Sequence, residues 1–233
     1  MTSSKAHTDI IGHRGASTAF RENTIEAFVG AFDMGADCVE FDVRFSLDKA
    51  LVVHHDPHLA DGRNICDTAV ADLPAHVPTV EQVLDAAASH AVNIEIKNGE
   101  HQVGFDPARR LADAVVAVIQ RREIQHAVLV SSFDLPMVDR ILNLDPNIAT
   151  ALLVARGDAQ ALIELCRARG HRTINPATWL VDDEFMSIAK LHDLRVNVWT
   201  EDDPDRIRQL AHMGVDGIVT NVPDVAIKAL AAM

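Results

Sequence analysis

Hydrophobic and polar residues follow two alternating patterns along this chain. Short segments in which apolar and polar residues alternate, or in which apolar residues predominate, predict strands, because successive side chains of a strand point to opposite faces. Longer segments with apolar residues three or four positions apart predict amphipathic helices. The two patterns take turns from Asp9 onward, which predicts a series of strand–helix units.

Eight such units can be placed along the chain. The predicted strands are 9–13, 38–44 with a continuation at 50–54, 92–97, 127–131, 148–154, 173–175, 195–199 and 217–220. The predicted helices are 23–34, 79–89, 107–122, 135–144, 159–169, 183–192, 204–213 and 225–232. Eight units predict an α/β fold, a single (β/α)8 TIM-type barrel that forms one domain over residues 1–233.

An open, doubly wound sheet is the alternative architecture. It usually has fewer strands and a glycine-rich phosphate loop after the first one. Gly12 and Gly15 do not complete the G-x-G-x-x-G pattern of that loop, so the closed barrel is favoured. The one long irregular segment lies at about 56–78, where a small insertion follows the second strand. Long loops are often functional, so we expect a lid or an excursion over the barrel mouth, with a plain surface loop nearly as plausible.

Composition narrows the class of protein. The chain has 233 residues, a length typical of one barrel domain, and 48% of them are hydrophobic. A net charge of -13 argues against nucleic acid or an anionic membrane surface as the partner. The N-terminal residues form no apolar run, and no segment reaches the ~18–20 apolar residues of a membrane span. We therefore expect a cytoplasmic protein without stable membrane association, and its oligomeric state stays open.

The three cysteines do not indicate a disulfide framework or a structural zinc site. Cys38, Cys66 and Cys166 lie far apart in the sequence and form no C-x-x-C spacing. We interpret them as small buried hydrophobic residues.

The segment from Val39 to Val43 contains the strongest chemical signal. In a strand, Glu40 and Asp42 must project from one face while the apolar residues between and beside them line the other. Two adjacent carboxylates repel each other unless a cation lies between them or one stays protonated. A second strand carries Glu95 and Lys97 with the same spacing, so three carboxylates and one ammonium meet if the two strands are neighbours.

Oxygen ligands of this kind suit magnesium or calcium, and Glu40, Asp42 and Glu95 would leave coordination positions for water and substrate. Zinc prefers histidine-rich coordination and is the second choice. The competing interpretation makes these acids buried ion-pair partners of Arg14 or Lys97.

His13 and His55 are candidates for general acid and base, because imidazole titrates near neutral pH. Both are predicted at strand ends, where barrel active sites lie. His54 is the immediate rival of His55, and strand alternation allows only one of the two to point inward. Trp199 ends another predicted strand and could form an apolar floor for a small carbon moiety, although it could equally fill the core.

The ordered set of motifs resembles the glycerophosphodiester phosphodiesterase family over nearly the whole chain. The motifs are His13-Arg14-Gly15, Glu22-Asn23-Thr24, Glu40-Phe41-Asp42, His55-Asp56, Glu95-Ile96-Lys97, Trp199-Thr200 and the segment 214–220. The resemblance implies a barrel enzyme that uses one divalent metal, magnesium or calcium with manganese possible, to hydrolyse small-molecule glycerophosphodiesters. The products would be glycerol 3-phosphate and an alcohol, which implies a place in lipid and glycerol metabolism.

Residue roles follow from the resemblance by matching position. They are metal binding by Glu40, Asp42 and Glu95, acid–base catalysis by His13 and His55, phosphate binding by Arg14 and Lys97, support of the site by Asn23 and Glu22, and contact with glycerol by Trp199. One histidine would deprotonate the glycerol 2-hydroxyl while the other protonates the leaving alcohol, with a cyclic phosphate intermediate that water opens. Direct attack by water, or by His13 as nucleophile, stays open.

Two features depart from the family pattern and concern substrate fit. Arg21 stands where many members have proline, and Asn221 stands where many have aspartate. The insertion after His55-Asp56 is also short, which would leave an open mouth. Two rival functions remain: a phospholipase D-like enzyme that acts on lysophospholipids or sphingomyelin, and a non-catalytic barrel that binds phosphorylated ligands.

Overall fold

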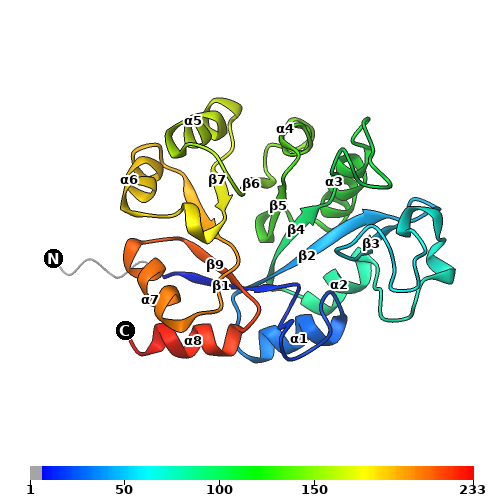
Figure 1. Cartoon of the computed structure of the whole chain (residues 1–233). Coiled ribbons are helices and arrows are strands. Elements are labelled where there is room, and N and C mark those ends of the chain that lie inside the picture. Colours follow the sequence, from blue (N-terminus) through cyan, green and yellow to red (C-terminus); the bar gives the residue numbers. More distant parts are fainter. Residues whose placement is uncertain (1–6) are drawn as a thin grey trace.

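The structure, a computed structural model, describes residues 7–233 and shows a closed barrel in this part of the chain (Figure 1). The parallel strands are β1 (Asp9–His13), β2 (Cys38–Phe45), β4 (Ala91–Ile96), β5 (Val128–Ser132), β6 (Ala149–Val154), β7 (Thr173–Pro176), β8 (Arg195–Val198) and β9 (Gly217–Thr220). Neighbours in this order pair in parallel, and β9 pairs with β1 to close the barrel. The predicted eight-stranded barrel is confirmed. The single domain over 1–233 stays a prediction, and residues 1–6 lie outside the described residues.

The helices form an outer ring around the strands (Figure 1). They are α1 (Ile25–Asp33), α2 (Val80–Ala87), α3 (Arg110–Arg122), α4 (Leu135–Leu144), α5 (Ala159–Arg169), α6 (Asp183–Leu191), α7 (Pro204–Met213) and α8 (Pro223–Ala231). Several begin after a side-chain oxygen that accepts a backbone N–H of the first turn, and the residues that provide it include Thr24, Thr79, Asp158, Asp182 and Asp203. No described helix has both the length and the apolar character needed to cross a membrane.

Two helices begin later than the pattern predicts. The first begins at Ile25 and not at 23, because Asn23 has a φ of 57° in the left-handed region. The third begins at Arg110 and not at 107, because Arg109 has a φ of 53° and the side chain of Asp106 accepts the backbone N–H of Arg110 at 2.6 Å. Hydrophobic spacing does not report these left-handed residues before the two helices.

The prediction that 50–54 continues the second strand is wrong, because the chain runs in the opposite direction there. Residues Leu51–Val53 form β3, which runs antiparallel to β2. The chain reverses in the turn before it, where the N–H of Ser46 donates to the carbonyl of Ala50 at 3.0 Å and Lys49 has a φ of 62°. Polar turn residues therefore outweigh the apolar similarity of the flanking segments.

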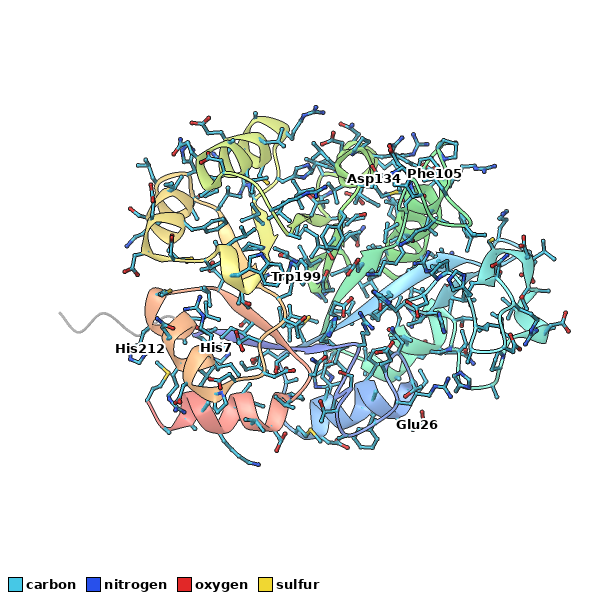
Figure 2. All side chains as sticks on the ribbon, in the orientation of Figure 1. His7, Glu26, Phe105, Asp134, Trp199 and His212 are labelled. Atoms are coloured by element: carbon cyan, nitrogen blue, oxygen red, sulfur yellow. The ribbon has the colours of Figure 1, made fainter. Side chains whose placement is uncertain are left out.

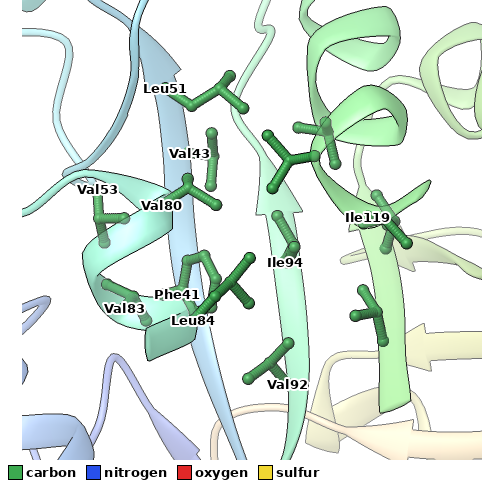
Figure 3. Packing of buried hydrophobic residues seen from close by; sticks show 14 of the residues in the cluster. Phe41, Val43, Leu51, Val53, Val80, Val83, Leu84, Val92, Ile94 and Ile119 are labelled. Atoms are coloured by element: carbon green, nitrogen blue, oxygen red, sulfur yellow. The ribbon is translucent and has the colours of Figure 1, made fainter. Parts of the chain in front are cut away.

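The core lies between the strands and the helices. Figure 3 shows this layer where Phe41 and Ile94 on the strands pack against Val83 and Leu84 of α2. A second apolar cluster covers the half of the barrel that includes β7 and β8. The insertion has a small core of its own, formed by Val52, Leu59, Ile65 and Val77. It lies beyond β3 at the edge of the molecule in Figure 1, and so does not cover the centre of the barrel.

Candidate active site

Glu40 and Asp42 lie on the barrel side of β2, as strand alternation predicts. They are 3% and 0% exposed, respectively. Phe41 between them is 0% exposed and belongs to the apolar cluster behind the strand. Strand geometry thus holds two carboxylates side by side and out of bulk solvent.

Glu95 on β4 completes an acidic cluster. Its Cα is the register partner of the Cα of Asp42. One carboxylate oxygen from each of Glu40, Asp42 and Glu95 lies within 4.8 Å of the others. Lys97 follows β4, with its Nζ 2.9 Å from Asp42 Oδ1 and in contact with the Glu95 carboxylate. The structure therefore brings together the three predicted metal ligands and the predicted phosphate-binding lysine.

Arg14 and Asn23 come from the loop between β1 and α1, where the backbone turns sharply. Arg14, Gly15 and Asn23 have φ angles of 56°, 84° and 57°. A Cβ on Gly15 would lie 2.4 Å from the carbonyl carbon of Ala27, so glycine is required there. The loop can therefore approach α1 closely and aim both side chains at the acidic cluster.

The loop contacts the carboxylates directly. The backbone N–H of Arg14 donates to Glu40 Oε2 at 3.0 Å, and the amide of Asn23 donates to Asp42 Oδ2 at 2.8 Å. Arg14 Nε lies 3.3 Å from the same Asp42 oxygen, and its Nη1 donates to the carboxylate of Glu22. Asn23 and Arg14 thus orient Asp42, and Glu22 orients Arg14.

Burial and neighbouring charges separate the pKa values of the three acids. Burial, followed by repulsion from Asp42 and Glu95, raises the pKa of Glu40 well above its ordinary value. Burial also raises the pKa of Glu95. Burial opposes ionisation of Asp42 as well, but Lys97 and Arg14 outweigh it and lower the pKa of Asp42 to about 2. Two cations therefore compensate Asp42 well and Glu40 poorly.

The acidic cluster fits a bound divalent cation. Glu40 Oε1 is buried and has no hydrogen-bond donor among residues 7–233, and a buried carboxylate oxygen is costly unless it is paired or coordinates a metal. The donors from Glu40, Asp42 and Glu95 are all carboxylate oxygens, the type that magnesium and calcium prefer. The ion-pair interpretation accounts for Asp42, which contacts Lys97, but not for the unpaired oxygen of Glu40.

His13 ends β1 and lines a cavity that Arg14, Glu40 and Glu95 also line. Its Nδ1 lies 2.7 Å from Asn221 Oδ1. The Asn221 amide nitrogen donates to Asp202 Oδ2 at 2.7 Å, which fixes Oδ1 as the acceptor toward His13. Nδ1 of His13 therefore carries the proton and Nε2 is free to accept one. Burial, followed by the charge of Arg14, lowers the pKa of His13 below its ordinary value.

His55 also lines the cavity, whereas His54 does not. His55 Nδ1 lies 2.7 Å from Asp56 Oδ1, a group that only accepts when ionised. His54 Nδ1 instead lies 2.9 Å from the main-chain oxygen of Asp56. Burial is the main reason why the pKa of His55 is also lowered. Only one of these neighbouring histidines lines the site, but both follow the end of β3 at Val53, so strand alternation does not explain the difference.

Aromatic side chains form another part of the cavity wall, to which Phe133 and Trp199 contribute. Trp199 follows β8, and its Nε1 donates to the main-chain oxygen of Asn175 at 2.8 Å. The rings of Phe133 and Trp199 pack edge to face, with their centroids 5.5 Å apart. The centroid of the Trp179 ring lies 6.1 Å from that of Trp199. In Figure 2, Trp199 lies at the inner edge of the barrel, while Glu26 lies on the outer side of α1.

Two adjoining cavities meet at the predicted catalytic and metal-binding residues. The smaller, about 270 Å³, contains His13, Arg14, Glu40 and Trp199. The larger, about 550 Å³, extends over the loops after β4 and β5. Residues that line both are His55, Glu95, Lys97 and Phe133. A bound phosphodiester therefore has room for one ester arm on each side.

Sequence reasoning missed several residues that orient the histidines. Asn221 and Asp202 act on His13, and Asp56 acts on His55. Asp56 could have been found as the residue after His55. Asn221 stood out in the sequence as a polar residue at a strand end and as a departure from the family's aspartate, but not as a partner of His13. Asp202 gave no comparable signal.

Comparison with known proteins agrees with this geometry. A sequence model described as the Glycerophosphoryl diester phosphodiesterase family matches residues 13–225. A glycerophosphodiester phosphodiesterase of Bacillus altitudinis is 30% identical, with coverage of 95% of this chain and 97% of the relative. One from Caldanaerobacter subterraneus subsp. tengcongensis is 26% identical, with coverage of 94% and 96%.

Solved structures share the fold. A glycerophosphodiester phosphodiesterase of Thermotoga maritima has a TM-score of 0.83 and 26% identity, with 97% of this chain and 99% of that chain covered. An Oleispira antarctica phosphodiesterase, solved in complex with the product sn-glycerol-3-phosphate, has a TM-score of 0.87 and 24% identity, with 96% of each chain covered. With the family match across almost the whole barrel, this chain belongs to the glycerophosphoryl diester phosphodiesterase family.

Proposed function

We propose that this protein hydrolyses glycerophosphodiesters to glycerol 3-phosphate and an alcohol with one divalent metal ion, magnesium or calcium, with manganese possible. The observation that carries the proposal is the buried cluster of Glu40, Asp42 and Glu95, flanked by two cations and two cavity-facing histidines. The family match and the names of the relatives support the same reaction.

Glu40, Asp42 and Glu95 would hold the metal ion. When bound, it supplies Lewis-acid polarisation of a phosphate oxygen and of the glycerol 2-hydroxyl. Three carboxylates against Arg14 and Lys97 leave the cluster one negative charge in excess. A divalent cation reverses that excess and makes the site attractive to a singly charged phosphodiester.

Arg14 and Lys97 would bind the phosphate oxygens. Burial opposes the charge on Lys97, but Glu95 and Asp42 outweigh it and raise its pKa. The pKa of Arg14 is raised in the same way, with burial opposing and Asp42 prevailing. Both side chains therefore stay protonated at neutral pH. Asn23 keeps Asp42 in place.

His13 and His55 would transfer the protons. His13 lines only the smaller cavity, beside Trp199, where we place glycerol, so its free Nε2 would take the proton of the glycerol 2-hydroxyl. His55 also lines the larger cavity, where we place the alcohol, so it would protonate the departing alcohol oxygen; Asp56 at Nδ1 opposes, but does not outweigh, the burial that lowers the pKa of His55. The hydroxyl oxygen bonds to phosphorus as the bond to the alcohol oxygen breaks. Water then opens the cyclic phosphate with the two roles reversed.

A coupled assay tests the reaction. Glycerol 3-phosphate release from glycerophosphocholine and glycerophosphoethanolamine is followed after chelation and after addition of magnesium, calcium or manganese in turn. We expect activity that disappears with the chelator and returns with at least one metal. A folded protein that hydrolyses neither diester with any metal overturns the proposal. Hydrolysis of lysophosphatidylcholine in that case would favour the phospholipase D-like function.

A further inference from the structure

Asn175 is a buried amide for which no hydrogen-bond partner exists in the described part of the structure. It is 1% exposed, and neither Oδ1 nor Nδ2 is paired. Its neighbour Ile174 packs in the apolar cluster between strands and helices, so alternation along β7 turns Asn175 to the barrel side. Asn175 lines the smaller cavity of about 270 Å³. An unpaired buried amide is destabilising, which calls for an explanation.

The position of Asn175 is defined by strand order. Four steps separate β7 from β2 in either direction around the barrel, so Asn175 lies across the cavity from Glu40 and Asp42. Two other polar residues that line this cavity pair with each other, because Ser131 Oγ donates to Asn93 Oδ1 at 2.9 Å. The wall near Asn175 otherwise includes aromatic and aliphatic residues: Phe133, Leu153, Trp199 and Val219.

The chemistry of an amide restricts what can pair with it. Asn175 offers two N–H donors and one acceptor oxygen. A phosphate oxygen accepts only and would leave Oδ1 unpaired. An alcohol hydroxyl both donates and accepts, so it can use either atom of the amide. A ligand hydroxyl, delivered to the wall opposite the charged cluster, is the group that fits.

We propose that Asn175 recognises the terminal C1 hydroxyl of the glycerol moiety and makes this hydroxyl a specificity determinant. The inference rests on the proposed function, which places the phosphate at Arg14 and Lys97 and commits the 2-hydroxyl to the attack on phosphorus. The terminal hydroxyl is then the part of glycerol left to reach the opposite wall. An acyl ester at this oxygen removes the donor and adds a chain that the enclosed wall does not accommodate, so lysophospholipids are rejected.

Trp199 lies next to Asn175 in the wall of the smaller cavity. Its indole N–H is held by the main-chain oxygen of Asn175, and the Asn175 amide is almost closed off from solvent. A hydroxyl therefore reaches the amide only if side chains in the cavity wall shift. We expect ligand binding to change tryptophan fluorescence, measured in a Trp179→Phe background so that Trp199 supplies the signal.

Binding of two phosphate monoesters tests the proposal without turnover. Calorimetry with the metal-loaded protein compares glycerol 3-phosphate with propane-1,2-diol 1-phosphate of the same configuration, which lacks only the terminal hydroxyl. The wild type is expected to bind glycerol 3-phosphate about 10–100-fold more tightly, because loss of the partner leaves a buried amide unpaired. In Asn175→Leu the ratio is expected to fall to about 1. Asn175→Ala provides the same comparison if the leucine variant does not fold.

Asn197 provides a matched control. It lies on the neighbouring strand β8, is 5% exposed and has an unpaired Oδ1, but it does not line the cavity. Asn197→Leu should keep the discrimination between the two monoesters. Asn175→Leu should also raise the midpoint of thermal unfolding by about 2–4 °C, because an unpaired polar group is replaced by an apolar one. A purely structural amide would give the opposite shift.

The outcomes separate this inference from the reaction itself. Equal binding of both monoesters by the wild type, binding of neither, or a ratio that Asn175→Leu leaves intact overturns the role of Asn175. Equal loss of discrimination in Asn197→Leu also overturns it, since a water held between buried amides would then suffice. Discrimination by a protein that hydrolyses no diester contradicts the proposed function and supports the role of Asn175.

Discussion

Two groups of side chains that could hold a metal ion lie at opposite ends of the barrel, and only one has the surroundings of a reactive site. Glu40, Asp42 and Glu95 are buried near the carboxyl ends of β2 and β4. His7, Asp9 and Asp37 form a cluster of similar dimensions around the start of β1. Spacing of the ligand atoms therefore does not distinguish the two groups.

The exposed cluster is satisfied by ordinary structural contacts. Asp37 Oδ2 accepts the backbone N–H of Ile10 at 2.9 Å, and Asp9 pairs with Arg195 at 3.1 Å. The side chain of His7 is 72% exposed. In the buried cluster, Glu40 keeps an unpaired oxygen instead. The comparison shows that burial and incomplete compensation of charge, more than proximity, create a demand for a cation.

The two clusters should differ most in how neutralising one of their acids changes kcat/KM. Glu40→Gln should lower kcat/KM by about 10⁴-fold, because loss of the metal removes several kcal/mol of transition-state stabilisation at about 1.36 kcal/mol per tenfold. Asp37→Asn should leave kcat/KM unchanged. Steady-state kinetics with glycerophosphocholine checks both. A comparable loss in Asp37→Asn would show that the exposed cluster also contributes to the reaction.

Replacement of His55 should lower kcat strongly, whereas replacement of His7 or His54 should not. His55→Ala removes a proton-transfer group and should lower kcat by about 10³-fold, within the range usual for general acid–base catalysis. His7→Ala and His54→Ala should retain wild-type kcat. Full activity of His55→Ala, or an equal loss in His54→Ala, contradicts the roles assigned here. Circular dichroism shows whether each variant is folded.

Metal binding should stabilise only through the buried cluster. At a free metal concentration of about 100 Kd the free energy of unfolding should rise by about 2.7 kcal/mol, which corresponds to a shift in the thermal midpoint of about 5–10 °C. Glu95→Gln should lose this shift and Asp9→Asn should keep it. Differential scanning fluorimetry with magnesium, calcium and manganese measures it. A shift that survives Glu95→Gln would place the metal elsewhere.

The smallest expected effect is on the pH dependence of the stability of the metal-free protein. The pKa of His13 is lowered on folding, mainly by burial, so below about pH 6.5 the unfolded chain binds a proton that the folded chain does not. Stability should therefore decrease as the pH falls through this value, by at most about 1.4 kcal/mol per pH unit. Thermal midpoints between pH 5.5 and 7.5 should vary less in His13→Asn, while His7→Asn should follow the wild type. Identical profiles for all three would exclude this contribution.

Residues on regular strands could be predicted from the sequence. The pairing of Glu40 with Asp42 and the placement of Glu95 follow from alternation, because a strand leaves each side chain only two directions. His55 lies after the end of β3, so its position facing the cavity does not follow from alternation. The same argument applies to β3 only after the chain reversal at Ser46 is recognised. Short turn segments decide direction, and their polar contacts are not visible in a hydrophobic pattern.

Contacts between distant segments could not be predicted. Asp202 meets Asn221 through the packing of two loops, and no spacing in the sequence reports it. The same holds for Asn175, which looks like any polar residue at a strand end until the structure shows that its amide has no partner. Hydrogen-bond satisfaction is a property of three-dimensional packing, so residues defined by its absence appear only there.

The hydrogen bond between His13 and Asn221 joins residues 208 positions apart, and this has a consequence for biosynthesis. A ribosome releases the N-terminal strand long before the C-terminal one. The barrel closes only when β9 has left the exit tunnel and pairs with β1, and His13 gains its partner only when Asn221 after β9 has followed. We therefore expect nascent chains that lack this segment to be catalytically incompetent however much of the barrel has formed, so that assembly of the site marks the completion of folding.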